Sequence, residues 1–152
     1  MIWQLIAALC AGTFAGAAIY ITAVEHPARL ECGFDLALRQ FAPSYRRATR
    51  MQASLAVVGS LCGLAAWAAG RGPLCLLGAI LLGAVVPFTL IVIYPTNRRL
   101  LDPALDPQSP EAERLLRRWG RLHAVRSALG AASFVASMLP VVSIPETLLA
   151  LR

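Results

Sequence analysis

Residues 74–94 read LCLLGAILLGAVVPFTLIVIY and give the clearest sign of the fold class. It holds 21 residues without one charged side chain, and a helix needs about 20 apolar residues to cross the hydrocarbon core of a bilayer. Three more apolar segments of similar length lie at about residues 2–24, 51–69 and 124–144. In lipid every backbone polar group must be paired within the protein, so such segments form helices. The sequence therefore predicts an all-α integral membrane four-helix bundle, with residues 1–152 as a single domain.

The composition agrees with a membrane protein. Of the 152 residues 58% are apolar and 14% are charged, whereas about a quarter of a soluble domain is charged. The mean hydropathy is +0.65. The net charge of +6 comes from 14 arginines, most of them between the apolar segments. Membrane topology explains this pattern, so we expect no nucleic-acid partner.

Two of the three connections are long and polar. Residues 25–50 carry five arginines against three acids, and residues 95–123 carry six against four. The third, Gly70-Arg71-Gly72-Pro73, predicts a tight turn and an antiparallel hairpin. Because positively charged loops stay in the cytoplasm, we expect both long loops there, in a bacterial-type inner membrane, with both termini outside. Each long loop should also hold a short interfacial helix, over residues 34–50 and from Ser109 onward.

Proline and glycine suggest further details of the bundle. Proline lacks an N–H group and collides with the preceding helical turn, so we expect the first helix to end at Glu25-His26-Pro27 and the third at Tyr94-Pro95. The pairs Gly12/Gly16 and Gly59/Gly63 allow close approach of helices. The Gly12/Gly16 face would also suit a homodimer.

The strongest candidate site is Trp119, His123 and Arg126. Their spacing of i, i+4 and i+7 puts them on one helical face. Ionisable residues at the mouth of a membrane helix are costly there and often functional. Imidazole titrates near neutral pH, and the indole offers a wall for a flat ligand. Arg126 needs a buried partner, for which Glu25 is the natural candidate.

Other polar residues map to the same side of the bundle. Glu25 and His26 form either an acid–base pair or a pair of metal ligands, and Asn97 can both donate and accept hydrogen bonds. Tyr45 and Gln52 are seven residues apart and share one helical face. The structural alternatives are headgroup-facing polar residues, a helix cap and an aromatic anchor at the interface. A one-sided polar cluster under an apolar cavity suits a membrane-embedded active site.

Four segments together resemble the anthrone oxygenase family, whose members are small four-helix membrane proteins. The resemblance covers about residues 8–140. It rests on VEHPAR (24–29), QFxxSYxR (40–47), IYPTNRRLL (93–101) and RWGRLHAVR (118–126). It implies oxidation of an anthrone to an anthraquinone with O2, without bound flavin or haem. It also implies His26, Asn97, Trp119, His123 and Arg126 as site residues, with Glu25 and Tyr45 beside them.

Three functional hypotheses remain open. The first is a membrane oxidoreductase with O2 as co-substrate that acts on a hydrophobic aromatic, phenolic or quinone-like small molecule. A histidine would remove a proton and Arg126 would stabilise the oxyanion. The second is a metal-dependent enzyme with one metal ion on His26, His123 and Glu25. The third is a non-catalytic protein that binds lipid or a small molecule. The first assigns catalysis to His123, His26, Arg126 and Asn97, and substrate binding to Trp119, Tyr45, Glu25 and Gln52.

Overall fold

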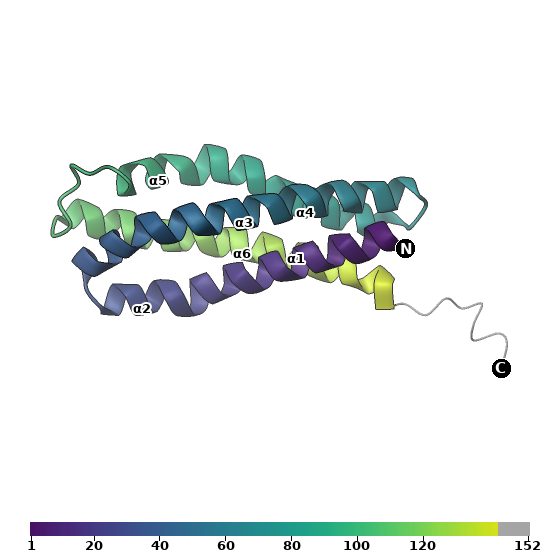
Figure 1. Cartoon of the computed structure of the whole chain (residues 1–152), viewed down its shortest axis with the longest axis horizontal. Helices are drawn as coiled ribbons and strands as arrows, with labels where there is room; N and C mark the ends of the chain where they lie inside the picture. The colour runs from purple at the N-terminus through teal and green to yellow at the C-terminus, as the bar shows by residue number, and fades with distance from the viewer. Residues whose placement is uncertain (143–152) are drawn as a thin grey trace.

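The computed structural model describes residues 1–142, and within them the chain forms an elongated bundle of four long helical rods (Figure 1). Each rod is long and apolar enough to cross a membrane, so the protein is an integral membrane protein and the predicted all-α bundle is confirmed. The last part of the fourth predicted span, residues 143–144, and the C-terminus lie outside the described residues. The rods are α1 (Ile2–Tyr20), η1 (Ile21–Glu25) and α2 (His26–Glu31); α3 (Phe34–Ala68); α4 (Pro73–Phe88), η2 (Thr89–Ile93) and α5 (Tyr94–Leu100); and α6 (Pro110–Val142).

The predicted helix ends at Pro27 and Pro95 are wrong, because both rods continue past the proline as α2 and α5. Each proline lies two residues after the last residue of a wide π turn. The N–H of His26 donates to the carbonyl of Ile21, and the N–H of Tyr94 donates to that of Thr89, both five residues back. The wider turn makes room for the proline ring, which would collide with the preceding turn of a regular α-helix. The rod can therefore continue past the proline.

The two expected interfacial helices are continuous with the spans that follow them. Residues 34–50 form the first part of α3, and the helix that begins at Pro110 runs without a break into the fourth span. The Ser109 hydroxyl accepts a hydrogen bond from the N–H of Ala112 at 3.2 Å, which caps α6 as predicted. Residues 32–33 and 101–109 remain outside helix in these two connections, and the longer of them is held by hydrogen bonds from Arg99 to Asp102 and Glu111.

The rods pack by close approach at small residues. Both α1 and α4 pack against α3 and α6. Gly59 and Gly63 lie inside these contacts: a Cβ atom on Gly63 would stand 2.9 Å from the Cβ of Ala79 and 3.3 Å from the carbonyl of Cys75. Gly12 faces Phe134 of α6, whereas a Cβ on Gly16 would meet nothing within 4 Å. The homodimer through Gly12 and Gly16 stays a prediction.

Gly63→Ala is therefore expected to lower the free energy of unfolding by about 1–3 kcal/mol, the usual effect of overpacking. Gly16→Ala is the matched control, since it adds the same methyl group to a helix where space is open. That control should be neutral or stabilising, because alanine favours helix more than glycine does. Thermal unfolding in detergent measures both, and equal midpoints for the two variants would contradict the packing described here.

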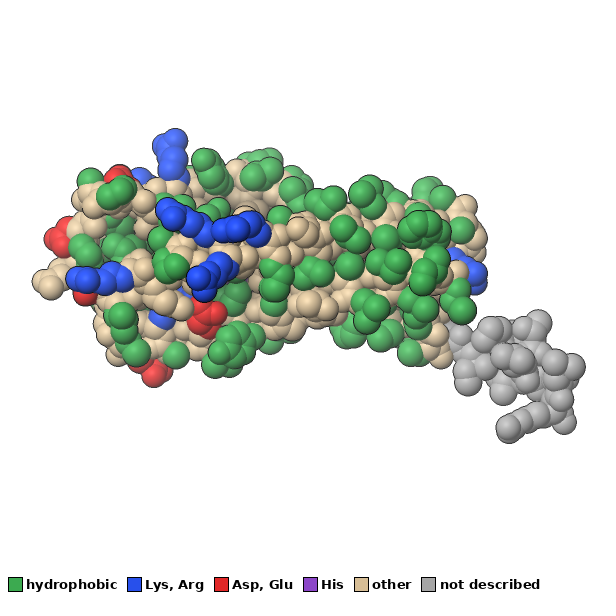
Figure 2. Space-filling model, in the orientation of Figure 1, with side chains coloured by type: hydrophobic (Ala, Val, Ile, Leu, Met, Phe, Trp, Pro, Cys, Tyr) green, Lys and Arg blue, Asp and Glu red, His purple; other side chains and the backbone are tan. Residues whose placement is uncertain are grey.

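Charged side chains gather at one end of the bundle, whereas the visible remainder is mostly hydrophobic (Figure 2). The charged end holds α2, α5 and the loop of residues 101–109 (Figure 1). The predicted polar residues of all four rods lie in this half. That this half of the bundle lies on the cytoplasmic side of the membrane stays a prediction.

Candidate functional site

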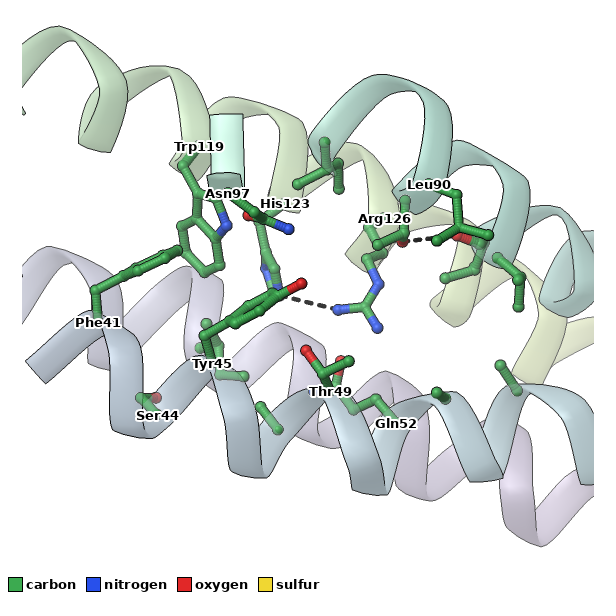
Figure 3. A pocket seen from close by; sticks show the side chains of 18 of the residues that line it. Phe41, Ser44, Tyr45, Thr49, Gln52, Leu90, Asn97, Trp119, His123 and Arg126 are labelled. Atoms are coloured by element: carbon green, nitrogen blue, oxygen red, sulfur yellow. Dashed lines mark hydrogen bonds between the residues drawn. The ribbon is translucent and has the colours of Figure 1, made fainter. Parts of the chain in front are cut away.

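A cavity of about 120 Å³ lies in this polar half, enclosed by all four rods (Figure 3). Its wall is apolar apart from a few polar groups that converge on it, which is the usual character of a ligand site. The volume is below the ~300–1,000 Å³ of typical ligand pockets, so a ligand of several rings requires part of the wall to move. Its polar and aromatic lining comes from Arg29 of α2, from Phe41, Ser44, Tyr45, Thr49 and Gln52 of α3, from Thr89 of η2, from Asn97 of α5, and from Trp119, His123 and Arg126 of α6.

His123 lies at the centre of the site and is only 3% exposed. Its Nδ1 atom is 2.9 Å from the hydroxyl of Thr22 in η1. Its Nε2 atom is 3.5 Å from Nη1 of Arg126, whose side chain enters the same cavity (Figure 3). The Thr22 hydroxyl is in turn 2.7 Å from that of Ser127, one helical turn after His123. The ring is therefore held at both nitrogens, from two different rods.

Arg126 does not pair with Glu25, so the predicted ion pair is wrong. Glu25 is held by Arg29, one turn further along the same rod, and its Oε1 atom also accepts from Ser44 at 2.8 Å and from Gln40 at 3.1 Å. The guanidinium of Arg126 lies 5.0 Å from the ring centroid of Phe14. No carboxylate of residues 1–142 forms a salt bridge with it, and its buried Nε has no hydrogen-bond partner there. A cation so placed favours an anionic ligand.

The indole of Trp119 packs against three other rings. Its ring centroid lies 4.7 Å from that of His123, 5.1 Å from that of His26 and 5.3 Å from that of Phe41. The guanidinium of Arg29 lies 5.8 Å from the same ring, which links the Glu25–Arg29 pair to the site. The predicted face of Trp119, His123 and Arg126 therefore lines one cavity.

His26 is a predicted site residue, but its side chain lies outside the cavity. It is buried against Trp119 but does not line the cavity. Gly120 makes room for it, since a Cβ there would stand 2.6 Å from Nε2 of His26. His26 thus supports the indole from outside the cavity.

The metal site predicted from His26, His123 and Glu25 is not assembled. Over residues 1–142 no three His, Cys, Asp or Glu side chains gather as a metal-binding group. The Oε1 atom of Glu25 already accepts hydrogen bonds from Arg29, Gln40 and Ser44. The two imidazoles instead pack on the same indole. The residues do not fit a metal ion in this arrangement, and we derive no step through one.

Two buried amides line the cavity with unused hydrogen-bonding capacity. Gln52 of α3 is 0% exposed, and neither atom of its amide has a partner among residues 1–142. Asn97 of α5 is 1% exposed, and its Oδ1 atom likewise has none. Figure 3 shows them entering from opposite sides of the cavity. Unpaired buried polar atoms are rare and costly, so both amides are available to a ligand.

Sequence reasoning missed Thr22, Ser127, Arg29 and Ser44. The spacing of i, i+4 between His123 and Ser127 was the one available signal for a hydroxyl beside the imidazole. Thr22 gave none, because it lies in an uninterrupted apolar run.

Comparison with known proteins gives the family. Residues 41–136 match the family model described as anthrone oxygenase. The chain is also 31% identical over 139 residues to the anthrone oxygenase tpcL of Aspergillus fumigatus, covering 84% of this chain and 85% of that protein. No solved structure matches. The matched segment contains most of the cavity lining, including Tyr45, Gln52, Asn97 and His123. The chain belongs to the anthrone oxygenase family.

Proposed function

We propose that this protein is a membrane oxygenase that oxidises a hydrophobic phenolic or quinone-like aromatic compound with O2, in the cavity around His123 and Arg126. The single observation that carries the proposal is a guanidinium that has no carboxylate partner among residues 1–142 and lies 3.5 Å from an imidazole nitrogen in a mostly apolar cavity. Imidazole can take a proton and the arginine can hold the anion that results. Family membership supports O2 as the oxidant.

For an anthrone the reaction balances without an external reductant. His123 removes a proton from the methylene carbon, and Arg126 stabilises the resulting oxyanion. The carbanion gives two electrons to O2 as the C–O bond forms, and protonation yields a hydroperoxide. Removal of the second C–H proton breaks the O–O bond. The carbon becomes a carbonyl, and the remaining oxygen leaves as water.

The other lining residues would bind and orient the substrate. Trp119 and Phe41 meet at nearly a right angle, with an interplanar angle of 89°, and give flat aromatic surfaces. The amides of Gln52 and Asn97 can bond to hydroxyl and carbonyl oxygens of the substrate. Glu25 would act only indirectly, by holding Arg29 against the indole.

Oxygen uptake by the purified protein with an anthrone tests this function. We expect one O2 consumed for each anthraquinone formed, at a rate well above a protein-free blank. Elemental analysis and a chelator distinguish a metal-dependent enzyme, which would lose activity with its metal. No uptake with any anthrone or hydroquinone would contradict the proposal and favour a binding protein.

We expect the substrate to enter from the bilayer between α3 and η2. Thr49, Ala53 and Leu90 line the cavity and are also exposed, and Leu90 is 62% exposed. Leu90→Trp should raise KM several-fold, because the larger side chain narrows this opening. Ile91→Trp is the matched control, since Ile91 is 73% exposed but does not line the cavity. Equal KM values for the two variants in lipid nanodiscs would show that entry takes another route.

A further inference from the structure

We infer that Thr22 and Ser127 form a hydrogen-bond relay that fixes His123 in one tautomer, with the proton on Nδ1 and an unprotonated Nε2 directed at Arg126. The inference rests on the proposed role of His123 as the base. It assigns Thr22 and Ser127 as positioning residues, since their hydroxyls contact the imidazole or each other and do not line the cavity.

The relay begins at two backbone carbonyls. The Ser127 hydroxyl lies 3.0 Å from the carbonyl of Ala18 in α1 and 3.0 Å from that of His123. A carbonyl only accepts, and a hydroxyl has one hydrogen to give. In the relay that we infer, this hydrogen goes to one of the two carbonyls, because Ser127 has carbonyl acceptors beside its hydroxyl and Thr22 has none among residues 1–142.

The next link follows from that assignment. Thr22 Oγ1 lies 2.7 Å from Ser127 Oγ, and with the serine hydrogen on a carbonyl, Thr22 donates to Ser127. Thr22 then has no hydrogen left for the imidazole. Its contact of 2.9 Å with Nδ1 of His123 must be an Nδ1–H group that donates to the threonine oxygen.

The contact at the second ring nitrogen favours the same tautomer, but at 3.5 Å it is too long to fix the tautomer without Thr22. Nε2 of His123 lies 3.5 Å from Nη1 of Arg126, and a guanidinium has only donors. A proton on Nε2 would set two donors against each other. The lone pair of Nε2 is therefore on the side of Arg126, where an acidic C–H or O–H group of a substrate would meet both residues.

The π turn η1 positions the Thr22 hydroxyl beside α6. Thr22 lies in that turn, opposite Ser127 on α6. Single π turns often occur at functional sites, and residues that hold the second nitrogen of a functional histidine set its tautomer and basicity.

Nitrogen NMR of the detergent-purified protein with ¹⁵N-labelled histidine tests the relay directly. The chain has two histidines, and His26→Gln assigns the signals. In the wild-type protein at neutral pH we expect a pyrrole-type Nδ1 and a pyridine-type Nε2 for His123. Thr22→Val keeps the side-chain shape but removes the hydroxyl, so both shifts should move toward averaged values. Thr22→Ser should restore the wild-type pattern.

Two further variants control for misfolding and for nonspecific effects of the substitution. Ser127→Ala frees the hydrogen-bond direction of Thr22 and should also give averaged shifts, even if Thr22→Val folds poorly. Thr13→Val is the matched control, because Thr13 lies on the same rod as Thr22 but is exposed and does not line the cavity. It should leave both His123 shifts unchanged.

Kinetics give a second readout. Thr22→Val should lower kcat by ~10–100-fold, as loss of such a partner usually does, with little change in KM, and Thr22→Ser should recover most of it. A wild-type His123 protonated on Nε2, or unaltered shifts in both Thr22→Val and Ser127→Ala, would overturn the relay. Because NMR needs no turnover, an inactive protein with the Nδ1–H tautomer would contradict the proposed function alone.

Discussion

His123→Gln is expected to lower kcat/KM by about 10²–10⁴-fold, the usual contribution of a general base. Glutamine fills similar space and can still meet the hydroxyl of Thr22, but it cannot accept and release a proton at neutral pH. Anthraquinone formation followed by absorbance, with the protein-free oxidation rate subtracted, measures the loss. Bound substrate should still be detectable, because Trp119, Gln52 and Asn97 remain in place.

The same substitution at the second histidine separates two assignments of the base. His26→Gln should have the smaller effect, because His26 acts on the cavity only by supporting Trp119. A nearly inactive His26→Gln protein beside an active His123→Gln protein would reverse the assignment.

Arg126→Gln is expected to lower kcat by about 10²–10³-fold, as removal of an oxyanion-stabilising donor does. Glutamine keeps a hydrogen-bond donor but loses the positive charge that the developing anion needs. Steady-state kinetics with an anthrone measures this change. KM should change less than kcat, because the neutral substrate gains little from the charge before its proton is removed.

Arg121→Gln is the matched control for this prediction. Arg121 lies on the same helix, but it is exposed and does not line the cavity. Its variant loses the same charge and should keep wild-type kinetics. Similar losses in both variants would point to a general effect of charge on the bundle and against an oxyanion site at Arg126.

The fold could be predicted because its decisive features are local. An uncharged run such as residues 74–94 has one stable arrangement in lipid, and four such runs make a bundle. The helix ends at Pro27 and Pro95 could not be predicted from proline alone. Proline signals a lost N–H group, but whether the chain ends there or widens into a π turn depends on packing against the other rods.

The site was predictable where it follows helical spacing and not where it depends on contacts between rods. Trp119, His123 and Arg126 share one face, as their spacing requires. Glu25 was wrongly assigned to Arg126. Arg29, one turn away, forms the ion pair with Glu25, and Ser44 of α3 donates a hydrogen bond to the same carboxylate. Thr22 carried no signal, since a hydroxyl in a membrane helix often bonds only to its own backbone.

Anaerobic mixing of the purified protein with an anthrone is the most informative measurement, because it isolates proton removal from the reaction with oxygen. The mechanism proposed for His123 and Arg126 predicts that the absorption of the anthrone anion appears in proportion to protein, is absent with His123→Gln and is strongly reduced with Arg126→Gln. It also predicts that the absorption of anthraquinone replaces that of the anion when O2 is admitted. Rapid aerobic turnover by a wild-type protein that forms no anion without oxygen would contradict it.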